Sequence, residues 1–250
     1  MTTKRHIIAK NIATLLHDGD FVNLGIGIPT LIGNYLPEGV TILLHGENGY
    51  VGQGKELPDR SMYDSKEALY DWWKRHGGEQ TDHNHPEGHR DLINAGGFYI
   101  NLIPGACCFD STMAFAMVRG GHLDATVLGG LQVDRHGNLA NWMVPGKKIS
   151  GVGGAMDLAA GTPRVIVAME HCTKGGEFRV LDECTMPLTA KACVNTLVTE
   201  LCIIDFEKTE NGETIPVVKA MAPGLTKENL QAKTGTKLTF AEELKEMLTL

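Results

Sequence analysis

Residues Phe21–Thr30 read FVNLGIGIPT, an apolar run followed by two glycines and a proline. Phe21–Leu24 is typical of a short buried strand, and Thr30–Leu36 is typical of a helix. Val40–Leu44 predicts a second strand, which leads directly into HGENG at residues 45–49. A strand, a glycine turn, a helix and another strand predict an α/β protein with an open, mainly parallel sheet flanked by helices.

The same alternation continues along most of the chain. We expect helices over Lys4–Leu16 and Ser111–Arg119, and strands over Phe98–Ile103, Ala125–Leu128, Leu139–Val144, Arg164–Met169 and Leu197–Phe206. The tail, Thr226–Leu250, predicts two short helices with Glu242, Glu243 and Glu246 on an exposed face. Residues 55–90 differ, because they are polar and rich in histidine and aromatic residues, with one possible helix at Tyr63–Arg75. We expect one domain, residues 1–250, with an insertion at about 55–90.

The composition excludes several classes of function. Of the 250 residues 42% are apolar and 21% charged, as in ordinary globular proteins. A net charge of −7 implies no basic face strong enough for non-specific binding of nucleic acid. The apolar runs are far shorter than the roughly 20 residues of a membrane span, and Met1–Lys10 lacks a signal-peptide core. The six cysteines form no C-x-x-C pair, so we expect reduced thiols in a cytoplasmic protein.

Glu47 is the most informative single residue. It follows an apolar strand and stands between Gly46 and the pair Asn48-Gly49, so little side-chain bulk surrounds it. A carboxylate in such a place could act as a general base or as a covalent nucleophile. The alternative is a turn acid that caps the next helix.

Glycine clusters supply a second candidate feature. Gly151-Val-Gly-Gly154 precedes a helix-forming stretch, so its backbone N–H groups could bind an anion or a developing oxyanion. A tight turn is the alternative. Gly25 and Gly27 lack the third glycine of a dinucleotide fingerprint, and no acidic residue lies at the expected distance. A Rossmann dinucleotide site is therefore excluded.

Three weaker patterns have ordinary explanations. His83, His85 and His89 could be metal ligands, although histidines in a polar insertion are more often solvated surface. Cys107-Cys108 could offer a nucleophile, but buried thiols are favoured because no histidine or acid lies nearby in sequence. Lys147-Lys148 could contact a phosphate or form a solvated turn.

Taken in order, the motifs resemble the β subunit of family I coenzyme A transferases, the group of 3-oxoacid and butyrate–acetoacetate CoA-transferases. The resemblance covers nearly all of residues 4–225 outside the insertion. The residues that carry it are Asn23–Thr30, Glu47–Gly49, Arg119–His122, Leu128–Val133, Asn138–Lys147, Gly151–Leu158, Pro187–Ala190 and Val198–Leu201. Two departures are His45-Gly46, where the family usually has Gln-Ser or a similar pair, and the length of the insertion.

The resemblance implies a fold related to ribose-5-phosphate isomerase, and it implies ping-pong catalysis in which Glu47 becomes a glutamyl-CoA thioester. Gly153 and Gly154 would supply N–H groups near the reacting carbonyl. The residues it places near substrate or CoA are Gly25, Gly27, Asn48, Asn138 and Lys147. It also implies a separate α subunit as partner and no metal or cofactor, because CoA enters as part of the substrate.

Alternative functions stay open at this point. An acyl-CoA hydrolase on the same scaffold would use water in place of the acceptor acid. A non-catalytic ligand-binding subunit would need neither Glu47-Asn48-Gly49 nor Gly153-Gly154. Within the insertion, Tyr70, Trp72 and Trp73 could line an acyl pocket, contact the partner or form a small core, and a subunit or lid contact is favoured.

Overall fold

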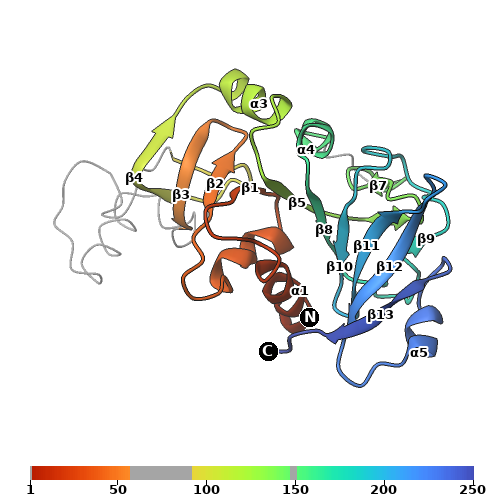
Figure 1. Cartoon of the computed structure of the whole chain (residues 1–250). Coiled ribbons are helices and arrows are strands. Elements are labelled where there is room, and N and C mark those ends of the chain that lie inside the picture. The colour runs from red at the N-terminus through yellow and green to blue at the C-terminus, as the bar shows by residue number, and fades with distance from the viewer. Residues whose placement is uncertain (1, 57–91, 147–150) are drawn as a thin grey trace. The chain divides into compact units, whose positions relative to one another are not determined.

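The computed structural model describes residues 2–56, 92–146 and 151–250 (Figure 1). The chain divides into two compact units, the first made of Met1–Ile42 and Met117–Leu250 and the second of Leu43–Ala116. Most of the insertion expected at about 55–90, including the helix expected at Tyr63–Arg75, lies outside the described residues. The grouping of both units into one domain stays a prediction.

Four parallel strands form the centre of the first unit. Their order is β1-β5-β8-β10, and their bounds are β1 Phe21–Leu24, β5 Ala125–Gly129, β8 Val165–Ala168 and β10 Thr196–Val198. All residues of β8 and β10 are buried. Such continuous apolar runs suit strands that are covered on both faces. The expected open, mainly parallel sheet is confirmed.

Three further strands extend this sheet beyond β10. β11 (Cys202–Lys208) and β12 (Thr214–Met221) are antiparallel to their predecessors, and β13 (Thr239–Glu246) runs parallel to β12. The single strand expected over Leu197–Phe206 is wrong, because the chain reverses between β10 and β11. The Thr199 hydroxyl accepts from the backbone N–H groups of Leu201 and Cys202, both at 3.1 Å, and this closes the turn.

The tail contains one helix where two were expected. α5 (Lys227–Gln231) begins after Thr226, whose hydroxyl accepts from Asn229 N at 3.2 Å. The second expected helix is instead β13, because Thr239 and Phe240 pair with β12. Its glutamates, Glu242, Glu243 and Glu246, are exposed as expected.

Helices and a small sheet complete the first unit. α1 (Thr2–Ala13) buries Ile8 and Ile12 and packs against β8 and η1 (Ile28–Asn34). η1 is a 3-10 helix, not the expected α-helix over Thr30–Leu36, and Gly33 lowers the helix propensity there. The remaining helix is α4 (Ala155–Gly161). The small sheet has the strand order β7-β6-β9, with β6 at Gln132–Asp134, β7 at Leu139–Ala140 and β9 at Val180–Leu181.

The strand expected over Leu139–Val144 ends at Ala140. The next residue, Asn141, leaves the ladder and uses its side chain to donate to the Gly129 carbonyl at 3.1 Å and to accept from the Thr189 hydroxyl at 2.6 Å. These two bonds fix the glycine turn after β5.

The second unit is an antiparallel sheet of β2 (Leu43–Gly46), β3 (Tyr50–Glu56) and β4 (Ile100–Cys108), with β4 at its edge. α3 (Ser111–Arg119) follows β4 and has the bounds expected from the sequence. Among the described residues, no helix is long and apolar enough to cross a membrane.

Candidate active site

Glu47 lies in a tight turn between β2 and β3. The Gly49 N–H donates to the Gly46 carbonyl at 2.9 Å, so Gly46–Gly49 is a β-turn with Glu47 and Asn48 at its two central positions. Glu47 is half-buried and Asn48 is exposed. The expectation that Glu47 stands between residues of little bulk at a strand end agrees with this geometry, whereas a cap on a following helix does not, since β3 follows.

Gly49 fits this turn for two reasons. Its φ is 123°, which side chains rarely adopt, and a Cβ atom at this position would collide with the Phe109 carbonyl oxygen. The Phe109 N–H donates to the Gly49 carbonyl at 3.0 Å. The chain that leaves β4 is therefore held directly against the turn that carries Glu47.

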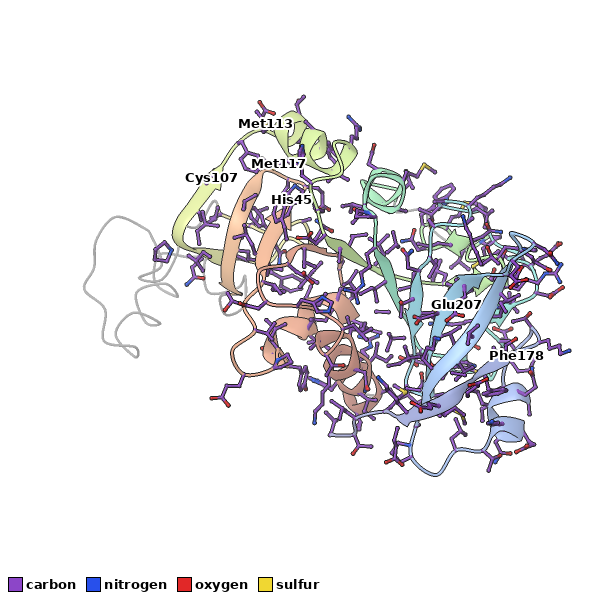
Figure 2. All side chains as sticks on the ribbon, in the orientation of Figure 1. His45, Cys107, Met113, Met117, Phe178 and Glu207 are labelled. Carbon is purple, nitrogen blue, oxygen red and sulfur yellow. The ribbon has the colours of Figure 1, made fainter. Side chains whose placement is uncertain are left out.

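His45 anchors the strand that leads into the turn. Its side chain is buried, and Nε2 lies 3.1 Å from the Ala114 carbonyl oxygen (Figure 2). Because a carbonyl only accepts hydrogen bonds, Nε2 carries the proton. Burial lowers the pKa of His45, although the Ala114 carbonyl and the charge of Glu47 act in the opposite direction. The imidazole is thus neutral at pH 7 and places no positive charge beside Glu47.

Asn48 makes a long-range contact. Its Nδ2 donates to the backbone carbonyl of Ile93 at 2.8 Å, across 45 positions of sequence. The family resemblance implies a substrate or CoA contact for Asn48, and the structure shows that part of its donor capacity is used within the protein.

Gly25 and Gly27 follow β1 in the first unit. The Gly25 N–H donates to the Val127 carbonyl at 2.8 Å, and a Cβ at residue 25 would lie 3.1 Å from that oxygen. Gly27 has φ 90°, and a Cβ there would meet nothing within 4 Å. The two glycines lie at the carboxyl end of a parallel strand, where open α/β sheets bind their ligands.

Gly153 and Gly154 precede α4 in the same unit. Gly153 has φ 53° and open space where a Cβ would be, and Gly154 is the N-cap with no side-chain hydrogen bond. Lys147 and the histidines His83, His85 and His89 lie outside the described residues. In the part of the chain that the structure describes, no three His, Cys, Asp or Glu residues form a group that could hold a metal ion.

Asn138 belongs to a network around the buried carboxylate of Asp134. That carboxylate accepts from four N–H groups, namely His136 N at 3.0 Å, Asn138 N at 3.2 Å, Asn138 Nδ2 at 2.9 Å and Cys184 N at 3.2 Å. The Oδ1 atom of Asn138 accepts from Ala192 N at 2.8 Å, and Ala192 has φ 47°. A CoA contact by Asn138 stays a prediction, and both ends of its amide already bind within the fold.

A second buried network, around His171, was not predicted. His171 Nδ1 lies 3.1 Å from Thr199 Oγ1, and Nε2 lies 2.9 Å from Thr234 Oγ1. Its backbone N–H donates to Glu200 Oε2 at 2.8 Å, and Lys4 Nζ donates to the other oxygen of Glu200 at 2.8 Å. Burial lowers the pKa of His171 to about 4. A histidine just after the apolar run of β8 was the only sequence signal.

The cysteines divide into two groups, all of them unpaired. Cys107 and Cys108 are exposed, so the expectation of buried thiols is wrong for this pair, because they end the edge strand β4 (Figure 2). Burial raises the pKa of the other thiols, to about 12 for Cys184 and Cys202 and to about 11 for Cys193. Those three are poor nucleophiles.

The candidate residues thus belong to both units: His45, Glu47 and Asn48 to the second, and Gly25, Gly27, Asn138, Gly153 and Gly154 to the first. The Coenzyme A transferase family model matches residues 5–65 and 85–233, so this chain belongs to the coenzyme A transferase family. The match is interrupted inside the segment expected as an insertion. Transfer of CoA from an acyl-CoA to a carboxylate is the activity of this enzyme class.

The individual proteins similar to this chain include a bacterial β subunit and a longer mitochondrial enzyme. The acetate CoA-transferase subunit beta of Escherichia coli K12 is 45% identical over 237 residues, which are 95% of this chain and 94% of that protein. Succinyl-CoA:3-ketoacid coenzyme A transferase 2A, mitochondrial, from Rattus norvegicus is 39% identical over 98% of this chain but only 41% of its own length. An acyl-CoA transferase structure from Escherichia coli O157:H7 shares the fold, with TM-score 0.68 at 18% identity over 99% of this chain and 44% of that one.

Proposed function

We propose that this chain is the catalytic β subunit of a CoA-transferase that moves CoA between short-chain or 3-oxo carboxylic acids, with Glu47 as the covalent nucleophile. The observation that carries the proposal is the position of Glu47 at the centre of the Gly46–Gly49 turn. Because glycine precedes Glu47 and follows Asn48, a bulky thioester can approach the Glu47 carboxylate closely.

The proposed reaction proceeds by a ping-pong mechanism. The Glu47 carboxylate attacks the thioester carbonyl and the C–S bond breaks, which releases CoA as the thiolate and forms an acyl-glutamyl anhydride. The thiolate attacks the glutamyl carbonyl, which releases the first carboxylic acid as its anion and leaves a glutamyl-CoA thioester. A second carboxylate then runs the same two steps in reverse and regenerates Glu47. The energy of the thioester is retained throughout.

The surroundings of Glu47 support this role. The side chain of His45 anchors β2 through the Ala114 carbonyl, and its lowered pKa keeps the imidazole neutral at pH 7. On the resemblance alone, we assign the N–H groups of Gly153 and Gly154 to stabilisation of the oxyanion, a role in which one such donor typically contributes about 10²-fold or more in rate. We assign Gly25, Gly27 and Lys147 to contacts with CoA or substrate on the resemblance alone.

The partner is proposed to be a separate α subunit. The chain spans nearly all of a bacterial protein named as a beta subunit, but only 41% of the longer rat enzyme. The name of that bacterial relative, a subunit beta, supports an α subunit as the partner. A cytoplasmic location is supported by six unpaired cysteines.

The test is to trap the covalent intermediate in the complex with the α subunit. The complex is incubated with acetoacetyl-CoA or butyryl-CoA without an acceptor acid, reduced with borohydride and mapped by peptide mass spectrometry. CoA thioester, or its reduced product, on Glu47 is the expected result. An unmodified Glu47 across a panel of acyl-CoAs, in a complex that binds CoA, would reject the covalent mechanism. Thioester cleavage without an acceptor carboxylate would then favour hydrolysis.

A further inference from the structure

We propose that Asn48 is a positioning residue that holds Glu47 in its attacking geometry through the backbone carbonyl of Ile93. The inference rests on the proposed function, since it assigns Asn48 a role only if Glu47 is the nucleophile. It replaces the substrate or CoA contact that the sequence predicts for Asn48.

The first argument is the geometry of the turn. Glu47 and Asn48 occupy the central positions of the Gly46–Gly49 turn, which the bond from Gly49 N to Gly46 O closes and which the Gly46–Tyr50 pair of the β2–β3 ladder flanks. The glycines at positions 46 and 49 have no side chains of their own that could bind this peptide. A side-chain bond from Asn48 therefore fixes the peptide that directly follows the nucleophile.

The second argument is that the acceptor is itself rigidly held. Ile93 pairs with Tyr99 in an antiparallel bridge, and Asn94, a buried residue, closes the hairpin between them. The Asn94 N–H donates to the Phe98 carbonyl at 2.8 Å, and Asn94 Oδ1 accepts from Phe98 N at 3.0 Å. A carbonyl in such a closed hairpin is a fixed point for the Asn48 amide.

The third argument is that this hairpin leads directly into the sheet. It continues into β4, whose residue Cys108 pairs with Tyr50 at the start of β3. Phe109, just after β4, donates to Gly49. The segment from Ile93 to Phe109 thus bonds to the turn at both of its ends. Ile93 accepts from Asn48, and Phe109 donates to Gly49.

The chemical consequence concerns rate more than affinity. The carboxylate of Glu47 has to lie within van der Waals distance of the thioester carbon along the line of attack. A displacement of about 1 Å can cost about 10²-fold in rate. Loss of a bond that only orients Glu47 should lower kcat, whereas loss of a substrate contact should raise KM.

The experiment compares three variants in the assembled complex with the wild type. Asn48→Ala removes the amide, Asn48→Asp keeps its size but removes the N–H donor, and Asn48→Gln keeps the donor on a longer side chain. Ala95→Ser, an exposed change at the tip of the same hairpin, is the matched control. The readouts are the single-turnover rate of glutamyl-CoA formation from butyryl-CoA, kcat, KM and assembly with the α subunit.

We expect Asn48→Ala and Asn48→Asp to slow glutamyl-CoA formation about tenfold or more, with KM for the acyl-CoA changed less than about threefold. Asn48→Gln should recover part of that rate, and Ala95→Ser should behave as wild type. If Asn48→Ala does not assemble, Asn48→Asp, which fills the same volume, carries the comparison. A wild-type rate in Asn48→Asp, or a rise in KM at unchanged kcat, overturns this inference alone. The absence of any adduct in the wild type overturns the proposed function and this inference together.

Discussion

The aromatic ring of Tyr50 occupies the space that a Cβ atom on Gly46 would need. Tyr50 is buried, and its hydroxyl donates to Gln53 Oε1 at 2.6 Å, so the ring cannot easily turn away. The residue that directly precedes Glu47 is therefore limited to glycine for as long as position 50 is tyrosine. The turn that carries the candidate nucleophile is shaped by packing as well as by hydrogen bonds.

Gly46→Ala should therefore destabilise the protein by about 1–3 kcal/mol and reduce activity, because the new methyl group has to displace a packed ring. Urea unfolding and the transfer rate of the complex measure the two effects. The same substitution in a Tyr50→Ala background should be much less harmful. Gly33→Ala is the control, since a Cβ at residue 33 would meet nothing within 4 Å. Equal costs for Gly46→Ala in both backgrounds would contradict the packing argument.

Glu47→Gln should abolish CoA transfer, by about 10³-fold or more, because an amide cannot form the anhydride or the glutamyl thioester. The half-buried side chain is close in size, so the unfolding midpoint and assembly with the α subunit should stay within error of the wild type. Glu38→Gln removes an exposed carboxylate and should leave activity intact. Transfer retained in Glu47→Gln would show that another group is the nucleophile.

Local patterns predicted some regular elements with their bounds and missed others, such as the strand expected over Val40–Leu44, which runs over Leu43–Gly46. Phe21–Leu24 and Ser111–Arg119 have the bounds that their sequences indicate. The errors arise where side chains or distant partners decide the structure. The reversal after β10 depends on the Thr199 hydroxyl, and the tail strand β13 exists because β12 offers it an edge.

In the candidate site, too, the sequence predicts features made by neighbouring residues and misses contacts between distant ones. Glu47 could be found from sequence because its strand and glycines are neighbours along the chain. The bond from Asn48 to Ile93 could not, because 45 residues separate its ends. Likewise, the exposure of Cys107 depends on β4 lying at a sheet edge, which a strand pattern alone does not reveal.

The buried His171 predicts a stability that depends on pH. Its pKa is about 4 in the folded chain and 6.5 when unfolded, so between these values only the unfolded state binds the proton. Stability should be full above pH 6.5 and fall by about 3 kcal/mol as the pH drops to 4, since each pKa unit corresponds to about 1.4 kcal/mol. Urea unfolding from pH 7.5 to 4 measures the slope.

His171→Gln is the variant that isolates this effect, because it cannot take up a proton. Its stability should be lower than that of the wild type at pH 7.5, and its dependence on pH should be shallower over the same range. His122→Gln, at an exposed residue, is the control and should keep the wild-type slope. Parallel curves for wild type and His171→Gln would reject the assignment to His171.

Asn138→Ala distinguishes a structural role from a contact with CoA. The substitution removes one donor from the buried Asp134 carboxylate and the acceptor of the Ala192 N–H, so we expect a loss of about 2–4 kcal/mol in stability. The KM for acyl-CoA should change less than about twofold. Asn211→Ala, at an exposed turn, should alter neither quantity. A large rise in KM at unchanged stability would instead support a direct contact with CoA.

Alkylation should separate the cysteines by their exposure. Iodoacetamide reacts with accessible thiolates, so brief treatment of the native chain at pH 8 should label Cys107 and Cys108 first. Cys202, which is fully buried and has a pKa of about 12, should react only after unfolding. Peptide mass spectrometry gives the order of labelling, and a denatured sample, in which all six thiols react, is the control. Because Cys107 and Cys108 end an edge strand, their protection on addition of the α subunit would place that strand in the subunit interface. Cys202 Sγ lies 3.7 Å from His171 Nδ1, so rapid labelling of Cys202 in the native chain would contradict the packing around His171.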